Sequence, residues 1–176
     1  TVYRLAREQD LGVSVNVFSE LHWYVDEEEY WEQQEAAITG FAPEVQPLRE
    51  VLAGTEPIHK ILVMGEEPSI DVLEAALTDR PELELAISRS KPTYLEITHD
   101  GVTKAAALTF LRDYFDIPLA ETLAIGDGGN DLPMVRAAGV GVAMGNGAKA
   151  LQQAADAVVA DNNVGGIAEA IKRFGI

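Results

Sequence analysis

The chain has 176 residues, of which 47% are hydrophobic and 24% charged, so it can bury a core without disulfides or structural metals. It contains no cysteine, which excludes disulfides, thiolate metal sites and a cysteine nucleophile. Its 13 basic and 29 acidic residues give a net charge of −16, which repels the phosphate backbone, so we expect no nucleic-acid partner. Since no long apolar run and no signal peptide is visible, we also expect no membrane partner and, by default, a cytoplasmic location.

Residues 1–98 are predicted to form an α+β domain on an open antiparallel sheet. Hydrophobic and polar residues alternate along several short segments, which is typical of strands with one buried face. Helical spacing of three and four residues predicts helices at 45–52 and 70–77. The expected order is the end of a helix, two strands, two helices, a strand, a helix and two strands, with residues 88–92 linking the last two strands. Strands are expected at residues 13–17, 22–25, 58–64, 82–87 and 94–97.

From residue 99 the pattern changes to short, continuous apolar runs, each followed by a helical stretch. The runs lie at residues 123–125, 140–144 and 157–160. Strands that are apolar on both faces and alternate with helices are typical of a parallel sheet covered by helices. A helix expected at 103–115 carries Leu108, Leu111 and Phe115 on one face. Residues 99–176 are therefore predicted to be part of a parallel, Rossmann-like core sheet, which makes the fold class α/β with an added α+β domain.

The strongest chemical signal follows the first of these runs. Residues 123–131 read Leu-Ala-Ile-Gly-Asp-Gly-Gly-Asn-Asp, so a buried strand ends in a glycine-rich turn that holds Asp127 and Asp131. Ligands of open α/β sheets bind at the carboxyl ends of strands. Mg²⁺ binds carboxylate and water oxygens, usually together with a substrate phosphate. The pattern favours a Mg²⁺ site at the two aspartates, although a helix cap at Asp131 and an ordinary turn explain the same residues.

Two further features carry a weaker signal. Lys104 lies in the first turn of the helix expected at 103–115, where the helix dipole disfavours a cation. It is either an exposed lysine or a group that holds a phosphate beside the helix amides. A Gly-Asn-Gly turn at 145–147 follows the next strand and is by itself a generic loop. The sequence has no dinucleotide fingerprint, no Walker lysine and no Gly-x-Ser-x-Gly elbow, and its three histidines do not have a metal-binding spacing.

Taken together and in this order, the motifs resemble the haloacid dehalogenase-like hydrolases, in particular their Cof-like phosphatase branch. Residues 94–98 with 101–104 look like the lysine motif of that branch, residues 126–134 like its metal motif, and residues 142–146 with 155–158 like its closing segment. The resemblance is clear over residues 91–176. It extends more loosely over residues 1–98, which would be the cap inserted in that branch, and residues 99–176 would be the C-terminal part of the hydrolase core.

The resemblance implies a Mg²⁺-dependent phosphatase that hydrolyses small phosphomonoesters such as sugar phosphates. Asp127 would ligate Mg²⁺, and Asp131 would ligate it through water or orient the site. Lys104 would neutralise the phosphoryl group and the nucleophilic carboxylate, and Asn130 would support the phosphate or the loop. These charges would stabilise the transferring group, which is where phosphoryl transfer gains most of its rate. In the cap, Arg89 would help to select the substrate, or would be an ordinary exposed turn residue.

The chain departs from the family at the nucleophile. The family forms an aspartyl-phosphate on the first Asp of an Asp-x-Asp pair, and no two aspartates of this chain are two residues apart. We therefore expect an N-terminally truncated member that is inactive by itself. The strand at 122–125 would then lack a neighbour, and an open apolar edge recruits partners. This predicts a homo-oligomer, besides the small phosphorylated metabolite that the whole protein would bind.

Two other functions remain open. The chain would instead be a catalytically inactive module for binding or assembly on the same scaffold, or a phosphomutase or sugar-phosphate binder. A preceding segment with an Asp-x-Asp pair would favour the enzyme. A natural start at or near Thr1 would favour the inactive module.

Overall fold

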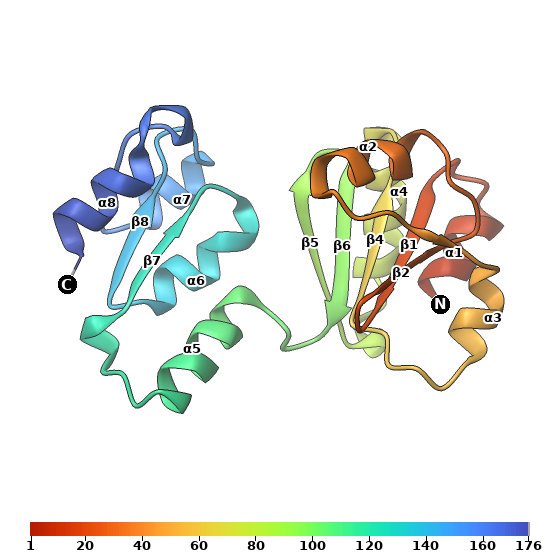
Figure 1. Cartoon of the computed structure of the whole chain (residues 1–176), viewed down its shortest axis with the longest axis horizontal. Coiled ribbons are helices and arrows are strands. Elements are labelled where there is room, and N and C mark those ends of the chain that lie inside the picture. Colours follow the sequence, from red (N-terminus) through yellow and green to blue (C-terminus); the bar gives the residue numbers. More distant parts are fainter. Residues whose placement is uncertain (176) are drawn as a thin grey trace. The chain divides into compact units, whose positions relative to one another are not determined.

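The computed structural model describes residues 1–175, and its chain divides into two compact units, Thr1–Asp100 and Gly101 onward (Figure 1). The boundary predicted at residues 98/99 lies two residues before this division. Each unit has its own sheet and its own hydrophobic clusters. Among the described residues, no helix is both long enough and apolar enough to cross a membrane.

The N-terminal unit is built on a six-stranded sheet in the order β3-β2-β1-β4-β6-β5. Its pairs are antiparallel, as the alternating pattern predicts, except that β2 and the short β3 run parallel. The sheet is therefore mixed, and β3 is a strand that the sequence pattern did not predict. The elements are α1 (Val2–Glu8), β1 (Ser14–Ser19), β2 (His22–Val25), α2 (Tyr30–Thr39), β3 (Glu44–Val45), α3 (Leu48–Ala53), β4 (Lys60–Met64), α4 (Glu67–Thr78), β5 (Leu85–Lys91) and β6 (Tyr94–His99).

The prediction that residues 88–92 form a link is wrong, because β5 continues to Lys91. A register shift between Arg89 and Lys91 lets the strand keep pairing with β6 past the end of its hydrophobic alternation. Arg89 pairs opposite Leu95 and turns its guanidinium towards α4, where acidic side chains bind it. A charged residue at an inward position hides the strand from a reading based on alternating hydrophobicity.

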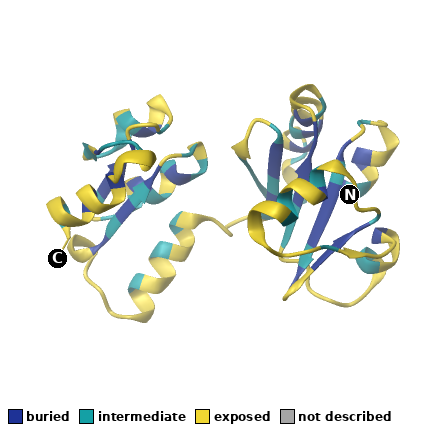
Figure 2. Ribbon diagram, turned by 45° about the horizontal axis from the view of Figure 1, so that its top comes forward, coloured by how far each residue is buried: buried dark blue, intermediate teal, exposed yellow. Residues whose placement is uncertain are grey.

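The two faces of this sheet are covered differently. One face packs against α1, α3 and α4 in the main core, and the other packs beneath α2 with Trp31 against Leu62, Met64 and Tyr94. Figure 2 shows the middle of the sheet buried and the outer surfaces of the helices exposed. The side chains of the main core include Leu5, Val15, Val17, Leu48, Val63, Ile70, Leu73, Leu77 and Leu95.

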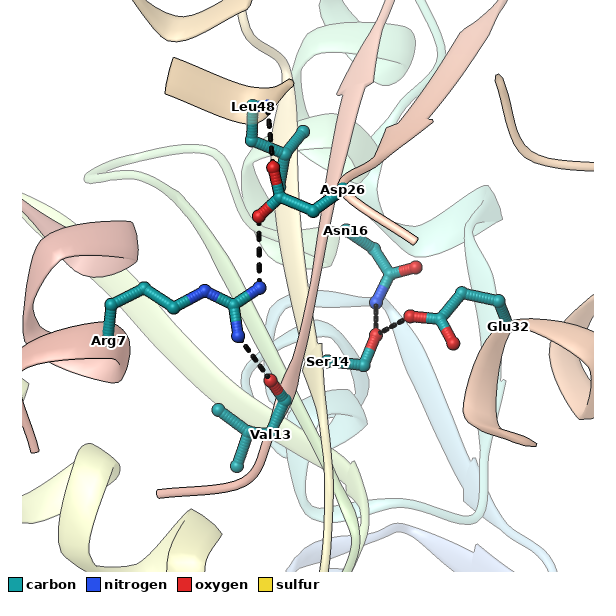
Figure 3. A network of polar contacts seen from close by, with 7 residues as sticks. All are labelled: Arg7, Val13, Ser14, Asn16, Asp26, Glu32 and Leu48. Carbon is teal, nitrogen blue, oxygen red and sulfur yellow. Dashed lines mark hydrogen bonds and ion pairs between the residues drawn. The ribbon is translucent and has the colours of Figure 1, made fainter. Parts of the chain in front are cut away.

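A buried polar network fixes α2 on its face of the sheet (Figure 3). The Ser14 hydroxyl donates to the carboxylate of Glu32, which is 4% exposed, and accepts a hydrogen bond of 2.7 Å from the amide of Asn16. Asn16 in turn accepts from the indole N–H of Trp23 at 2.8 Å. The second oxygen of Glu32 accepts from the backbone N–H of Glu29 at 3.0 Å, at the start of α2. These buried groups are paired with one another, so each offsets the other's desolvation.

The C-terminal unit contains a three-stranded parallel sheet in the order β7-β8-β9, which confirms the predicted strand type. Neighbouring residues of β8 face opposite sides of the sheet. Val142 packs in a cluster with Ala170 of α8, and Ala143 packs in a cluster with Val135 of α6 and Leu151 of α7. The elements are α5 (Lys104–Tyr114), β7 (Leu123–Gly126), α6 (Leu132–Ala137), β8 (Val140–Ala143), α7 (Lys149–Ala154), β9 (Ala157–Val158) and α8 (Gly166–Phe174).

The helix α5 forms where the spacing predicts it, but its apolar side chains are not buried. Among its residues and those just after it, Phe110, Leu111, Tyr114 and Phe115 are each about half exposed or more. Rings of Phe110 and Tyr114 stack on one another, and Tyr114 meets Phe115 edge to face. Within the described residues, β7 is at the edge of its sheet. This unit therefore presents an apolar surface on α5 and an open strand edge at β7.

Candidate functional site

The structure places Asp127 and Asp131 in one loop at the carboxyl end of β7. Asp127 follows the strand directly, and Asp131 ends a short 3-10 turn, Gly129–Asp131, that leads into α6. One oxygen of Asp131, Oδ2, accepts hydrogen bonds from the backbone N–H groups of Asp127 and Gly128, both at 3.0 Å. The carboxylate of Asp131 therefore holds the backbone of the loop that carries Asp127.

The close approach of Asp131 explains the glycine at the end of the strand. A side chain on Gly126 would overlap the Cβ of Asp131, and its own Cβ would lie 2.9 Å from Oδ2 of that residue. Gly129, two positions before Asp131, has open space around the same position. Only one of these two glycines is thus required by packing, and that packing turns the Asp131 carboxylate inward, where it is 4% exposed.

Lys104, which is far from Asp131 in the sequence, completes this cluster. Its ammonium donates to Oδ1 of Asp131, in an ion pair between an exposed lysine stem and a buried carboxylate. Lys104 is the first residue of α5, and the hydroxyl of Thr103 caps that helix by accepting from the N–H of Ala106 at 3.1 Å. The cap fixes the start of α5 and with it the point from which the lysine extends.

The electrostatics of the cluster favour an ionised Asp131. Burial alone would raise the pKa of this carboxyl group. The hydrogen bonds from Lys104, Gly128 and Asp127, together with the charge of Lys104, outweigh burial and hold the pKa below its ordinary value. Asp131 is thus a fixed anion whose oxygens are occupied by protein donors, which favours the expectation that it orients the site.

Asp127 is the exposed carboxylate of the site. Its Oδ2 accepts a long hydrogen bond of 3.5 Å from the amide of Asn146, a residue of the Gly-Asn-Gly turn. Its backbone carbonyl accepts from the N–H of Ala148 at 3.0 Å. A hard oxygen donor that remains accessible suits a cation such as Mg²⁺. Among the described residues, however, no group of three or more His, Cys, Asp or Glu side chains could hold a metal ion by itself.

The other two predicted site residues, Asn130 and Arg89, belong to different units of the chain. Asn130 is half-buried in the same loop, and a Cβ on Gly128 would lie 2.5 Å from its side-chain oxygen. Arg89 belongs to the N-terminal unit, where its guanidinium makes ion pairs of 2.6 Å with Asp71 and with Glu74 of α4. Its role in substrate binding stays a prediction, since these carboxylates already engage its charge.

One residue of the site was not singled out by sequence reasoning. Asn146 lies within the segment that carries the family resemblance, but the motif by itself gives it no role. Its position shortly after β8, which neighbours β7, is the signal that places it near the site, because the ends of adjacent parallel strands lie together.

The comparisons with known proteins agree with this fold. The haloacid dehalogenase-like hydrolase family matches residues 1–171, and the chain belongs to this family. A Haemophilus influenzae protein, named as a candidate phosphatase, is 39% identical over 93% of the chain. The Bacillus subtilis protein named 5-amino-6-(5-phospho-D-ribitylamino)uracil phosphatase YitU is 31% identical over 94% of the chain. The predicted resemblance is confirmed.

Solved structures show the same fold. A haloacid dehalogenase-like hydrolase from Bacteroides thetaiotaomicron matches 98% of the chain with a TM-score of 0.81 and 31% identity. A structure described as the subclass IIB sugar phosphatase BT4131 matches 99% of the chain with a TM-score of 0.81 and 26% identity. The chain spans 64% and 65% of these two structures, and 60% and 63% of the Haemophilus and Bacillus relatives.

Proposed function

We propose that the chain is part of a Mg²⁺-dependent phosphatase that hydrolyses small phosphomonoesters. The observation that carries this proposal is the cluster of Lys104, Asp131 and Asp127 at the carboxyl end of β7. The fold family and the phosphatase names of the relatives support it. The mixed cap sheet of residues 1–98 and the parallel core of residues 99–176 are the two parts in which this function would be organised.

Each residue of the cluster has a distinct role in the proposed site. Asp127 offers a carboxylate oxygen to Mg²⁺, which would supply positive charge next to the phosphoryl oxygens. Asp131 fixes the loop through its two backbone hydrogen bonds and holds the ammonium of Lys104 in place. Lys104 supplies a second positive charge for the phosphoryl group, and Asn130 supports the loop or the phosphate.

The nucleophile is not among the 176 residues. In the proposed reaction the first carboxylate of a further Asp-x-Asp segment attacks phosphorus, and the second Asp gives its proton to the leaving alcohol. The same second Asp then takes a proton from the water that hydrolyses the aspartyl-phosphate. The relatives are longer than the part that this chain matches, which leaves room for such a segment. We therefore propose that residues 1–176 are inactive on their own and active within a longer polypeptide.

The names of the relatives suggest a class of substrate. One relative is named for a phospho-ribityl compound, and one neighbouring structure for sugar phosphates. Both carry a phosphate ester on a small polyhydroxylated molecule. We propose that the small phosphorylated metabolite bound here belongs to this class.

The decisive experiment begins with the coding sequence upstream of Thr1. The protein that includes any in-frame preceding segment is purified beside residues 1–176, and phosphate release from p-nitrophenyl phosphate and sugar phosphates is measured with and without Mg²⁺. We expect Mg²⁺-dependent turnover by the longer protein alone, and its loss in Asp127→Asn. Asp116→Asn is the matched control, because Asp116 is an exposed aspartate in a left-handed conformation that asparagine also adopts.

Two results would contradict the proposal. The first is a longer protein that lacks an Asp-x-Asp segment and hydrolyses no phosphomonoester. The second is turnover that Asp127→Asn leaves unchanged. The first would favour the second candidate, an inactive module for binding or assembly, which the absence of an Asp-x-Asp pair within residues 1–176 also supports. The second would show that the activity does not depend on Asp127.

A further inference from the structure

The loop between β8 and α7 packs against Asp127, the proposed metal ligand. The N–H of Met144 donates to the carbonyl of Gly126 at 2.9 Å, and the N–H of Ala148 donates to the carbonyl of Asp127 at 3.0 Å. A Cβ on Gly147 would lie 3.3 Å from both Cα and the carbonyl oxygen of Asp127. The loop therefore packs directly on the backbone of Asp127.

The side chain of Asn146 is held at both ends within this loop. Its Nδ2 donates to Oδ2 of Asp127 at 3.5 Å, and its Oδ1 accepts from the backbone N–H of Asn162 at 3.0 Å. Because Oδ1 faces an N–H group, the amide is oriented with its donor towards Asp127. Asn162 lies in the segment after β9, so Asn146 links the segments that follow all three strands of the parallel sheet.

A glutamine of the next helix fixes the loop on both sides of Asn146. Nε2 of Gln152 in α7 donates to the carbonyl of Gly145 at 2.8 Å and to that of Gly147 at 3.0 Å. Both of its amide hydrogens are thereby committed to the residues that flank Asn146. A turn of two glycines would otherwise be flexible, and Gln152 restricts it.

From this geometry we propose that Asn146 is a positioning residue for the carboxylate of Asp127, and that Gln152 acts through Asn146. The inference rests on the proposed function, because it concerns Asp127 as the ligand of a divalent cation. An exposed carboxylate is free to rotate about its side-chain bonds, and ordering it opposes binding. Asn146 binds one oxygen, Oδ2, so the other oxygen of the same carboxylate would serve the cation.

The chemistry of an amide suits this role. A lysine in the same place would neutralise the carboxylate and repel the cation, and Lys104 is committed to Asp131 instead. An amide donor carries no net charge, so it orients Asp127 without competing for it. Partners that hydrogen-bond to a metal ligand typically contribute about 10–100-fold to metal affinity. Since the bond to Asp127 is long, we expect an effect at about the lower end of that range.

The test measures metal affinity directly, with Mn²⁺ as the probe and its paramagnetic resonance signal as the readout, on residues 1–176. Asn146→Ala is expected to weaken Mn²⁺ binding about tenfold, and Gln152→Ala to weaken it by a smaller factor. Asn163→Ala is the matched control, because the side-chain amide of Asn163 donates to Asp161 within its own turn. In an Asp127→Ala background, Asn146→Ala should have no further effect, since the two residues act on one ligand.

The outcomes separate this inference from the proposed function. If Asp127→Ala leaves Mn²⁺ affinity unchanged, or the chain binds no Mn²⁺, the metal site and the inference both fail. If Asp127→Ala weakens binding while Asn146→Ala and Gln152→Ala do not, only the inference fails. Circular dichroism and the urea unfolding midpoint are measured for each variant. If Asn146→Ala does not fold, Gln152→Ala decides, because it leaves Asn146 and Asp127 intact.

Discussion

Asp131 determines the shape of the site through contacts that a single methyl group would break. The inward turn of its carboxylate depends on Gly126 having no side chain, whereas Gly129 in the same loop has open space around it. Alanine at these two positions is therefore expected to affect stability differently, and that difference tests whether Asp131 packs as described.

We predict that Gly126→Ala lowers the free energy of unfolding by about 1–3 kcal/mol, because the new methyl group must displace Asp131 or the strand. Gly129→Ala should leave stability within about 1 kcal/mol of the wild type, or raise it slightly by restricting the unfolded chain. Urea unfolding of the two variants measures both. Equal destabilisation by the two substitutions would show that the packing at Gly126 is not the cause.

The stabilisation from Asp131 should depend on pH in one direction. Its pKa in the folded chain is below the unfolded value of about 3.9. As pH falls, Asp131 is therefore protonated first in the unfolded chain. Its ionised form stabilises the fold fully above the unfolded pKa, and this stabilisation is lost as pH falls through the folded pKa.

We predict that wild type exceeds Asp131→Asn in unfolding free energy by a constant amount between about pH 5 and pH 7, and that this difference shrinks below about pH 4. Urea unfolding at each pH gives the difference, in which other carboxylates such as Asp26 cancel. A difference that stays constant down to about pH 3 would contradict the role given to the ionised carboxylate.

At the scale of single elements, α5 depends on its N-terminal cap, since none of its side chains is fully buried. We predict that Thr103→Ala destabilises the C-terminal unit by about 1 kcal/mol, through loss of the hydrogen bond to Ala106. Thr109→Ala, in the middle of the same helix, should be neutral or stabilising, because alanine is the better helix former. The amide exchange rates of α5 report both changes, and equal rates in the two variants would show that the cap is not needed.

The sequence predicted the strands and helices wherever hydrophobic spacing was regular, as at β1, β7, β8 and α5. Alternation fails where a charge interrupts it, as at Arg89 in β5, and it does not reveal β3, whose two residues Glu44 and Val45 form no apolar run. Periodicity also reported the apolar face of α5 but could not show that nothing within residues 1–175 buries it.

The site divides in the same way. Asp127, Asp131 and Lys104 were found from their motifs, and the pairing of Lys104 with Asp131 required the fold, because α5 must lie beside the loop after β7. The role of Asn146 also required the fold. An asparagine between two glycines is typical of many turns, and only the hydrogen bonds to Asp127 and Asn162 distinguish this one.

For the whole molecule, the exposed surface of α5 and the edge of β7 raise the question of what covers them. We propose that a second copy of the chain does so. We predict that residues 1–176 self-associate in sedimentation experiments, and more strongly with added salt, because salt screens the net charge of −16. The double variant Phe110→Gln and Tyr114→Gln should shift the chain towards monomer, whereas Val72→Gln, an exposed apolar position on α4, should not.

A chain that stays monomeric at high concentration and high salt would contradict this prediction. So would equal association of all the variants, since that would place the contact elsewhere.

The two sheets also differ in how far apart along the chain their partners lie. In the C-terminal unit each strand pairs with the next one in sequence, as Leu123 does with Val140, so only short loops are closed. In the N-terminal unit β1 pairs with β4. Two strands and two helices separate these strands in the sequence, and Ser14 pairs with Met64. Closing a longer loop costs more chain entropy and slows the formation of the strand pair. The strand that presents Asp127, β7, is therefore expected to pair with β8 before β1 pairs with β4 in the larger sheet.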